Sequence, residues 1–360
     1  MNYQTSTQKK SWTFASSEEL DRRRKEQRKK VLVLLLGNNN ANNNNTNNNK
    51  AAKEEFLEDE KNAEKLKKEF SFPTAKEEEI YRKRLEAKID PLCSAFNLPI
   101  KVTQTATALF KRYCLSNPIV MTNLKIVMVA SVYVACKVEE SYVSAEQLCK
   151  VVKDIDYNKV LNAELAVLQG VDFQLISFGA FRPLRGFRAD ATHSVNSRDD
   201  SSSNNNKEVA IEKIRECYNK SQEDLKKQLL TDAMFLFPPG QLALSAFLKA
   251  AREVECKELE EYIVTKCLRN EADLLRNLDT IEKMTREEGA EPKEAEAKKA
   301  DQAMKAFQKK NAKTLGAALK KQASKENLAV QDDEEDEEAR KKKKQKMMEE
   351  KRAKEDAAFD

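Results

Sequence analysis

Two charged residues interrupt apolar helical stripes in the middle of the sequence, and their chemistry decides how this region is interpreted. Lys137 lies near the end of the apolar stretch TNLKIVMVASVYVACKVEE, and Glu164 lies within YNKVLNAELAVLQGVDF. At 3.6 residues per turn, each charge shares a stripe with apolar side chains. Loss of hydration there is unfavourable unless a partner compensates. Either Lys137 and Glu164 satisfy each other within one domain, or they contact another molecule.

The other residues do not form a recognisable combination for catalysis or metal binding. The only histidine, His193, stands in a polar stretch, and the seven cysteines contain no CxxC pair. This spacing argues against a zinc site and a disulfide framework, and it favours buried or half-buried free thiols. The seven glycines form no phosphate-binding loop. We therefore expect a non-catalytic protein that needs neither a metal nor a cofactor.

Charge and hydropathy argue against a nucleic-acid-binding protein and against a membrane protein. The 65 basic and 60 acidic residues leave a net charge of only +5, which creates no general field for nucleic acid. The longest apolar run, from Val31 to Leu36, is far shorter than the roughly 20 residues that span a bilayer. No secretory signal opens the sequence. These features predict a soluble intracellular protein without direct contacts to nucleic acid or membrane.

Caps and apolar periodicity predict five helices between residues 74 and 173. The first begins at Thr74, which has capping-box spacing to Glu77, and Ile89 lies on its inner face. The third, which ends near Lys137, is apolar nearly all round and should be the central helix. Ser144 caps the fourth helix, and short links join all five. The pattern predicts a compact helical domain.

A second helical domain is predicted for residues 178–287, with a polar insert at 193–206. Its segment PPGQLALSAFLKAAREV aligns with the central helix of the first domain at an offset of 115 residues, so that Arg252 falls on Lys137. Its helices again number five. The predicted fold class is therefore all-α, with two tandem five-helix repeats and helical extensions at both ends.

The two ends are compositionally distinct from these repeats. Residues 1–37 predict an N-terminal extension helix, and residues 38–73 an asparagine-rich and charged linker that forms a disordered loop. Residues 288–360 predict a charged C-terminal helix and tail, partly disordered, with few large apolar residues to bury. Their basic run RKKKKQK is a candidate nuclear signal, so a nuclear location is expected.

Several motifs in register resemble the cyclin family, and more closely its cyclin H branch. They are YVACKVEE, NAELAVLQGVDF, LTDAMFLFPPGQLALSAFLKAAR, the N-terminal QKKSWTF followed by SSEEL, and FRPLRGF. The resemblance covers residues 3–22 and 74 to about 285, and it implies two tandem cyclin boxes. The asparagine tract and the insert at 193–206 depart from the family pattern.

The resemblance also implies a role for the two charges. In cyclins, the residues that match Lys137 and Glu164 bond to kinase backbone around the kinase's C helix. Holding that helix inward lets the kinase form its own Lys–Glu ion pair and aligns its activation loop. Further kinase-facing candidates are Val138, Leu148, Ala163 and Leu168, although apolar residues at helical spacing also build cores. Trp12 is expected to anchor the N-terminal helix, either on the body or on the kinase.

The implied partners are those of the CDK-activating kinase. They comprise a cyclin-dependent kinase catalytic subunit, a RING-finger assembly factor and transcription factor IIH. The implied function supports phosphorylation of activation segments of other cyclin-dependent kinases and of the RNA polymerase II C-terminal repeats. Two alternatives stay open: another transcriptional cyclin subtype, and a nucleic-acid-associated factor resembling transcription factor IIB. The second carries a zinc ribbon with paired CxxC motifs, whereas this chain has no cysteine before Cys93.

Overall fold

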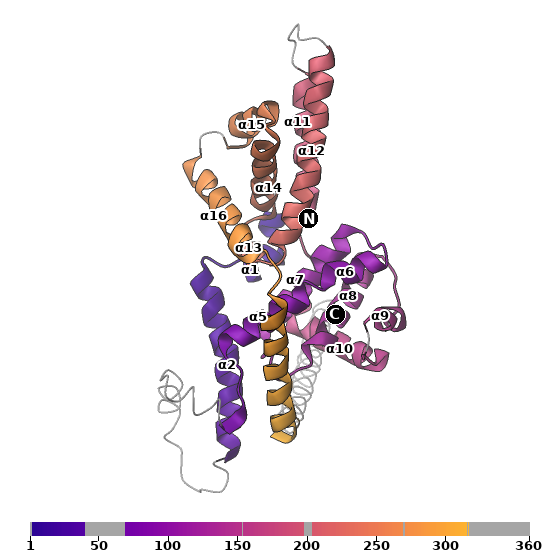
Figure 1. Ribbon diagram of the computed structural model, residues 1–360, viewed down its shortest axis with the longest axis vertical. Helices are drawn as coiled ribbons and strands as arrows, with labels where there is room; N and C mark the ends of the chain where they lie inside the picture. Colours follow the sequence, from indigo (N-terminus) through magenta and orange to yellow (C-terminus); the bar gives the residue numbers. More distant parts are fainter. Residues whose placement is uncertain are drawn as a thin grey trace, which may run out of the picture.

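The computed structural model describes residues 2–39, 69–152, 154–197, 204–268, 271–314 and 316, and these residues form helices joined by turns, without a strand. Figure 1 shows one group of helices in the upper half, another in the lower half, and two long extension helices alongside the lower group. Within the described residues, none of the helices is both long and apolar enough to cross a bilayer.

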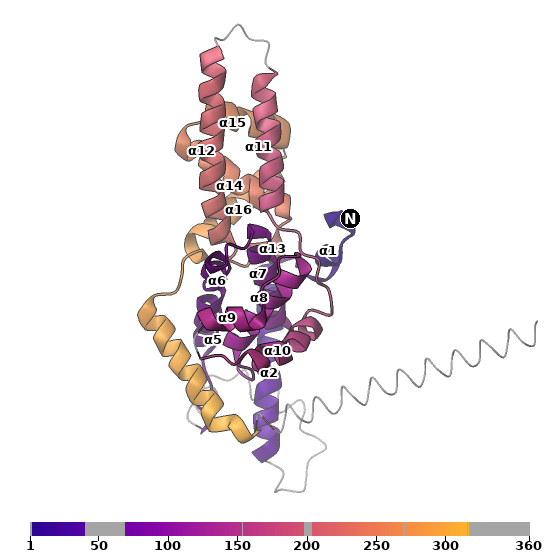
Figure 2. The ribbon, with the colours of Figure 1, turned by 90° about the vertical axis from the view of Figure 1, so that its right-hand side faces the viewer.

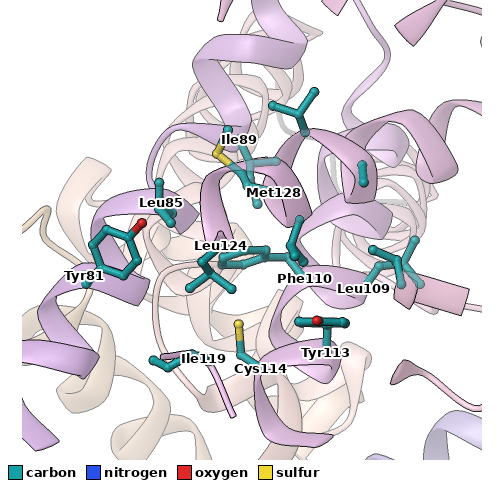
Figure 3. Packing of buried hydrophobic residues seen from close by; sticks show 14 of the residues in the cluster. Tyr81, Leu85, Ile89, Leu109, Phe110, Tyr113, Cys114, Ile119, Leu124 and Met128 are labelled. Carbon is teal, nitrogen blue, oxygen red and sulfur yellow. The ribbon is translucent and has the colours of Figure 1, made fainter. Parts of the chain in front are cut away.

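The lower group is the first repeat, and its helices surround a single apolar core. Its elements are α5 (Ala75–Glu86), α6 (Ile89–Ala95), α7 (Ile100–Ser116), α8 (Leu124–Val138), α9 (Ala145–Val151) and α10 (Tyr157–Gly170). Figure 3 shows side chains of α5 to α8 converging in this core. Capping boxes at Thr74 with Glu77 and at Ser144 with Gln147 confirm both predicted helix starts.

The first predicted helix is divided into α5 and α6. The chain leaves the helix at Ala87 and restarts, so that Ile89 begins α6. Pro91 explains the break, because a proline inside a continuous helix would lack a donor and clash with the carbonyl four residues earlier, that of Ala87. In the first turn of α6 the missing donor is not needed.

The upper group is the second repeat, which has its own apolar core. Its elements are α11 (Phe181–Asn196), α12 (Asn204–Gln228), α13 (Ala233–Leu236), α14 (Pro239–Val254), α15 (Lys257–Tyr262), the π-helix η2 (Ile263–Leu268) and α16 (Ala272–Glu288). α14 begins 115 residues after α8, as the predicted offset requires. The polar insert at 193–206 begins in the last turn of α11 and ends in the first turn of α12.

The extension helices pack on the first repeat rather than standing apart from it. The N-terminal extension comprises η1 (Tyr3–Thr5), α1 (Thr7–Ser11) and α2 (Ser17–Asn39), and a C-terminal helix covers residues 294–314. Phe72 meets Phe307 edge to face, with ring centroids 5.2 Å apart, and both side chains are buried. The start of the tail therefore buries more apolar surface than its composition predicted.

Other sequence-based predictions meet the structure in different ways. All seven cysteines are free, five of them buried and two half-buried, which confirms the thiol prediction. Most of the predicted asparagine-rich linker at 38–73 lies outside the described residues, and so does the RKKKKQK run.

A buried cluster of charges joins the two repeats. Lys111 of α7 bonds Glu86 of α5 at 2.9 Å and donates to the carbonyl of Thr231, beside α13, at 2.8 Å. Asp232 lies 3.8 Å from the same ammonium and accepts from Arg24 of α2 at 2.7 Å. Burial alone would raise the pKa of Glu86, but Arg82 and Lys111 hold it below its ordinary value. The cluster connects α2, the first repeat and the second repeat.

Candidate partner-binding site

Lys137 and Glu164 are brought together where the central helix reaches the surface. α8 is buried along most of its length, and its one exposed residue is Lys137, in its last turn. α10 packs against α8, and its start is capped by Asp156, whose carboxylate accepts from the Asn158 amide at 3.0 Å. This packing places Glu164 opposite Lys137.

The two charges form an ion pair that stays open to solvent. Lys137 Nζ donates to both carboxylate oxygens of Glu164, at 2.6 and 2.8 Å, and lies 4.4 Å from the ring centre of Tyr133. Partial burial works to lower the pKa of Lys137, but the contacts with Glu164 and Tyr133 raise it above its ordinary value. The side chains keep 45% and 23% of their surface exposed. The pair is therefore formed in the free chain and remains accessible.

Exposed apolar side chains are concentrated in the part of the sequence that follows Lys137 and contains Glu164. Among the described residues, twelve large apolar side chains are exposed, and seven of them lie between residues 142 and 176. These seven are Tyr142, Val151, Tyr157, Leu161, Leu165, Phe173 and Ile176. Three of them recur every four residues along α10 and so share one of its faces. A concentration of exposed apolar surface with polar groups at its edge is typical of a protein-interaction site.

The turn after α10 projects an aromatic ring into solvent. Asp172 and Phe173 both adopt left-handed backbone conformations, with φ of 52° and 55°. Such angles are rare for a bulky residue and concentrate at functional positions. The Phe173 amide donates to the Leu168 carbonyl at 2.9 Å, which ends the helix in a compact turn. The Phe173 side chain nevertheless remains 61% exposed, so the turn holds it outward.

The other predicted site residues are either half-buried or fully buried. Val138, Ala163 and Leu168 are half-buried, packed against the core with part of each side chain at the surface. Leu148 is fully buried, in contrast to the partner-facing position predicted for it. Its place in the apolar stripe of α9 is that of a core residue.

Trp12 is also buried, and its contacts are with the body of this chain. Its indole donates to the side-chain carbonyl of Gln174 at 2.9 Å. The guanidinium of Arg112 lies over its ring, 5.4 Å from the centre. Of the two anchoring sites predicted for Trp12, the structure shows the one within this chain.

Sequence reasoning overlooked two prominent members of the surface. Tyr142, which is 84% exposed, and Phe173 both lie in turns after helices, outside the helical stripes used to find candidates. A signal was present: an aromatic residue stands three or four residues after the end of an apolar helix in each of KVEESY and QGVDF. Helical periodicity carries no information about such turn positions.

Family models and relatives agree with this architecture. The model described as "Cyclin, N-terminal domain" matches residues 53–176, and "Cyclin C-terminal domain" matches residues 179–287. Cyclin-H1-1 of Arabidopsis thaliana is 30% identical over 262 residues, covering 73% of this chain and 74% of the plant protein. Cyclin-H of Xenopus laevis is 30% identical over 235 residues, covering 60% of this chain and 67% of the frog protein.

A solved structure shares the fold. A chain in the CAK complex of Chaetomium thermophilum bound to ATP-gamma-S superposes with a TM-score of 0.57 at 20% identity, covering 87% of this chain and 88% of that chain. The chain folds into two helical repeats in tandem, and it matches both cyclin domain models and relatives of the cyclin H type. We conclude that the chain belongs to the cyclin family.

Proposed function

We propose that this chain is the regulatory cyclin subunit of a CDK-activating kinase, and that it binds and activates a cyclin-dependent kinase. The observation that carries the proposal is the half-exposed Lys137–Glu164 ion pair, where the last turn of α8 meets the middle of α10. Exposed apolar side chains lie on α10 and in the loops after α8 and α10. The relatives named cyclin H and the fold shared with a chain of a CAK complex support it. The chain donates no catalytic group.

The mechanism is positional. A bidentate ion pair fixes both charged ends before the partner arrives, which lowers the ordering cost of binding. Lys137 Nζ can donate a third hydrogen bond to a backbone carbonyl, and the Glu164 oxygens retain lone pairs for a backbone N–H. Tyr142, Leu165 and Phe173 would bury apolar surface around these polar contacts. Such a surface holds the kinase's C helix in its active position.

The assembly in which this subunit acts follows from the same proposal. Its partners are a cyclin-dependent kinase, a RING-finger assembly factor and transcription factor IIH, and its location is the nucleus. The kinase complex phosphorylates activation segments of other cyclin-dependent kinases and the C-terminal repeats of RNA polymerase II. The family match disfavours a factor resembling transcription factor IIB, and the near balance of charge supplies no field for DNA.

The deciding experiment removes both charges from the full chain. Lys137→Ala combined with Glu164→Ala should weaken kinase binding by about 30-fold, the loss of a hot spot of about 2 kcal/mol. Helical content should stay unchanged. Arg252→Ala combined with Glu260→Ala is the matched control. This exposed pair, 3.9 Å apart, joins the last turn of α14, the counterpart of α8, to α15. If binding and kinase stimulation survive the first change, the interface is assigned incorrectly.

The kinase itself is identified by purification from the source cells. The co-purified kinase is assayed on an activation-segment peptide and on a polymerase heptad-repeat peptide. Phosphorylation of both peptides is expected for a CDK-activating kinase, whereas phosphorylation of the heptad peptide alone would favour another transcriptional cyclin subtype.

A further inference from the structure

The N-terminal segment makes its strongest contacts with the linker between the repeats. The side-chain amide of Gln8 pairs with the backbone of Phe178: Gln8 Nε2 donates to the Phe178 carbonyl at 3.2 Å, and the Phe178 amide donates back to Gln8 Oε1 at 2.6 Å. Tyr3 meets Phe178 edge to face, with centroids 6.0 Å apart. Four residues after Gln8, Trp12 bonds the Gln174 side chain. Two buried side chains, Gln8 within α1 and Trp12 at its C-terminal end, thus bond the two ends of the linker at residues 174–178.

The same linker is also held by a buried cation of the first repeat. Arg112 of α7 donates through Nη1 to the carbonyls of Gln174 and Ile176, at 2.9 and 3.3 Å. No carboxylate of the described residues lies within ion-pair distance of this guanidinium, and burial lowers the pKa of Arg112 to about 10. The Trp12 ring covers it. Because a buried charge needs compensation, the linker carbonyls and the indole are fixed together.

The segment also reaches the second repeat. The Phe14 amide donates to the Phe235 carbonyl at 2.8 Å, and the two rings meet edge to face at 5.9 Å. In both ribbon views α1 lies next to α13, at the level where the repeats meet (Figures 1 and 2). Residues 3–14 therefore bridge the linker and the second repeat.

The gripped linker carries part of the exposed apolar surface. Phe173 immediately precedes Gln174, and Ile176 lies between Gln174 and Phe178, the two residues that the N-terminal segment contacts. Both side chains point into solvent although their neighbours are held tightly. Fixing the backbone in this way sets the direction of both side chains before a partner binds, which reduces the ordering cost at the interface.

We propose that residues 3–14 form a clasp that presents Phe173 and Ile176 to the kinase, with Gln8, Trp12 and Arg112 as positioning residues that do not touch it. This inference rests on the proposed function, because it assigns the exposed part of the linker to the kinase interface. Loosening the clasp lets the linker sample other conformations, so only a fraction of molecules presents the surface correctly.

Gln8→Ala is the main test, measured in the full chain. It should raise amide hydrogen exchange across residues 174–178 and weaken kinase binding about tenfold, equivalent to about 1.4 kcal/mol. Trp12→Phe, which keeps an aromatic ring near Arg112 but removes the bond to Gln174 together with the second ring of the buried indole, should act in the same direction. The matched control is Lys10→Ala in the same short helix, because Lys10 is exposed. It should change neither quantity.

A double-mutant cycle separates positioning from general stabilisation. In a Phe173→Ala background, Gln8→Ala should weaken kinase binding by less than it does in the wild type, because one of the presented side chains is already missing. An equal effect in both backgrounds would overturn the proposal, and so would unchanged exchange at 174–178. If the wild-type chain binds no kinase, the proposed function fails, whereas the exchange measurement still tests the clasp in the free chain.

Discussion

Two interhelical ion pairs of the first repeat have similar lengths but opposite settings. Lys111 and Glu86 meet at 2.9 Å with almost no exposed surface, and Lys111 also reaches a carbonyl beside the second repeat. Lys137 and Glu164 meet at 2.6 Å in a half-exposed position, and solvent-facing apolar side chains lie on the same helix as Glu164. Distance alone does not distinguish them. The difference lies in what else each charge can bond to: folded chain in the first pair, and water or a partner in the second.

This difference indicates that the buried pair stabilises the fold, whereas the half-exposed pair is suited to recognition of a partner. When one member of a buried ion pair is removed, the other charge stays buried without compensation, which is costly. A buried cluster therefore fixes which helices pack together. A half-exposed pair contributes little to stability because water competes for both ends. Its value lies in holding two donors and acceptors ready at the surface. Each prediction below tests one side of this contrast.

The largest effect is expected for the buried cluster. Glu86→Ala removes the nearest carboxylate of Lys111 and Arg82 in the interior and leaves only the more distant Asp232, so it should lower the free energy of unfolding by about 3–5 kcal/mol. Chemical denaturation measures the loss. Glu79→Ala, at an exposed position on the same helix, serves as the control and should change stability by about 0.5 kcal/mol or less. A small loss for Glu86→Ala would mean that the cluster does not hold the repeats together.

Glu78, a second buried carboxylate of α5, has its pKa shifted in the opposite direction to that of Glu86, so its contribution to stability should change with pH in the opposite sense. Burial raises the pKa of Glu78 to about 7, although its ion pair with Arg28 of α2 works to lower it. Because the folded pKa exceeds the ordinary value of 4.5, folding takes up a proton in this interval. The stability contributed by Glu78 is complete below pH 4.5 and is lost as the pH rises through about 7.

Glu78→Gln tests that sign. The amide stays neutral and can still accept from Arg28, so the variant should lose the part of the pH dependence between pH 5 and 8 that Glu78 contributes, up to about 3 kcal/mol at 1.36 kcal/mol per pKa unit. Unfolding free energies of wild type and variant are compared across this range. Glu79→Gln is the exposed control on the same helix. Parallel curves for wild type and Glu78→Gln would show that this carboxyl titrates as an ordinary surface group.

The surface around Lys137 should show the reverse profile, with large effects on binding and small effects on folding. Tyr142→Ala should weaken kinase binding about tenfold, because a highly exposed aromatic side chain is a suitable interface anchor. Its unfolding midpoint in denaturant should stay close to that of the wild type. Val209→Ala on α12 is the control, an exposed apolar side chain of the second repeat. Equal effects of the two changes on kinase binding would remove Tyr142 from the interface.

The parts of this architecture that depend on local chemistry were predictable. The capping boxes at Thr74 and Ser144 are set by residues three positions apart, and the offset that relates α8 to α14 is a property of sequence periodicity. The helical type of both repeats follows from the same local patterns. Lys137 and Glu164 were found because a charge on an apolar stripe is conspicuous within a single helix.

The parts that depend on distant contacts were missed. Glu86 and Asp232 belong to different repeats, and nothing near either residue indicates that Lys111 will join them. Leu148 was predicted to face a partner, and the anchoring site of Trp12 was left open, because periodicity does not reveal which other segment covers a side chain. The C-terminal helix was underestimated for a different reason. Its Met304 and Phe307 follow Ala297 and Ala300 at helical spacing, but small and charged residues kept the average hydropathy low.

The smallest expected effect is the most direct test of the contrast. In the free chain, a double-mutant cycle on Lys137 and Glu164 should give a coupling of about 0.2–1 kcal/mol in unfolding free energy. About 1 M salt should remove most of it, because the screening length falls to about 3 Å. The same cycle on Glu86 and Lys111 is the comparison, and its coupling should be larger and insensitive to salt. A strong, salt-independent coupling between Lys137 and Glu164 would make them a second structural cluster. The two charges would then stabilise the fold of this chain, and they would not be available to bind a kinase.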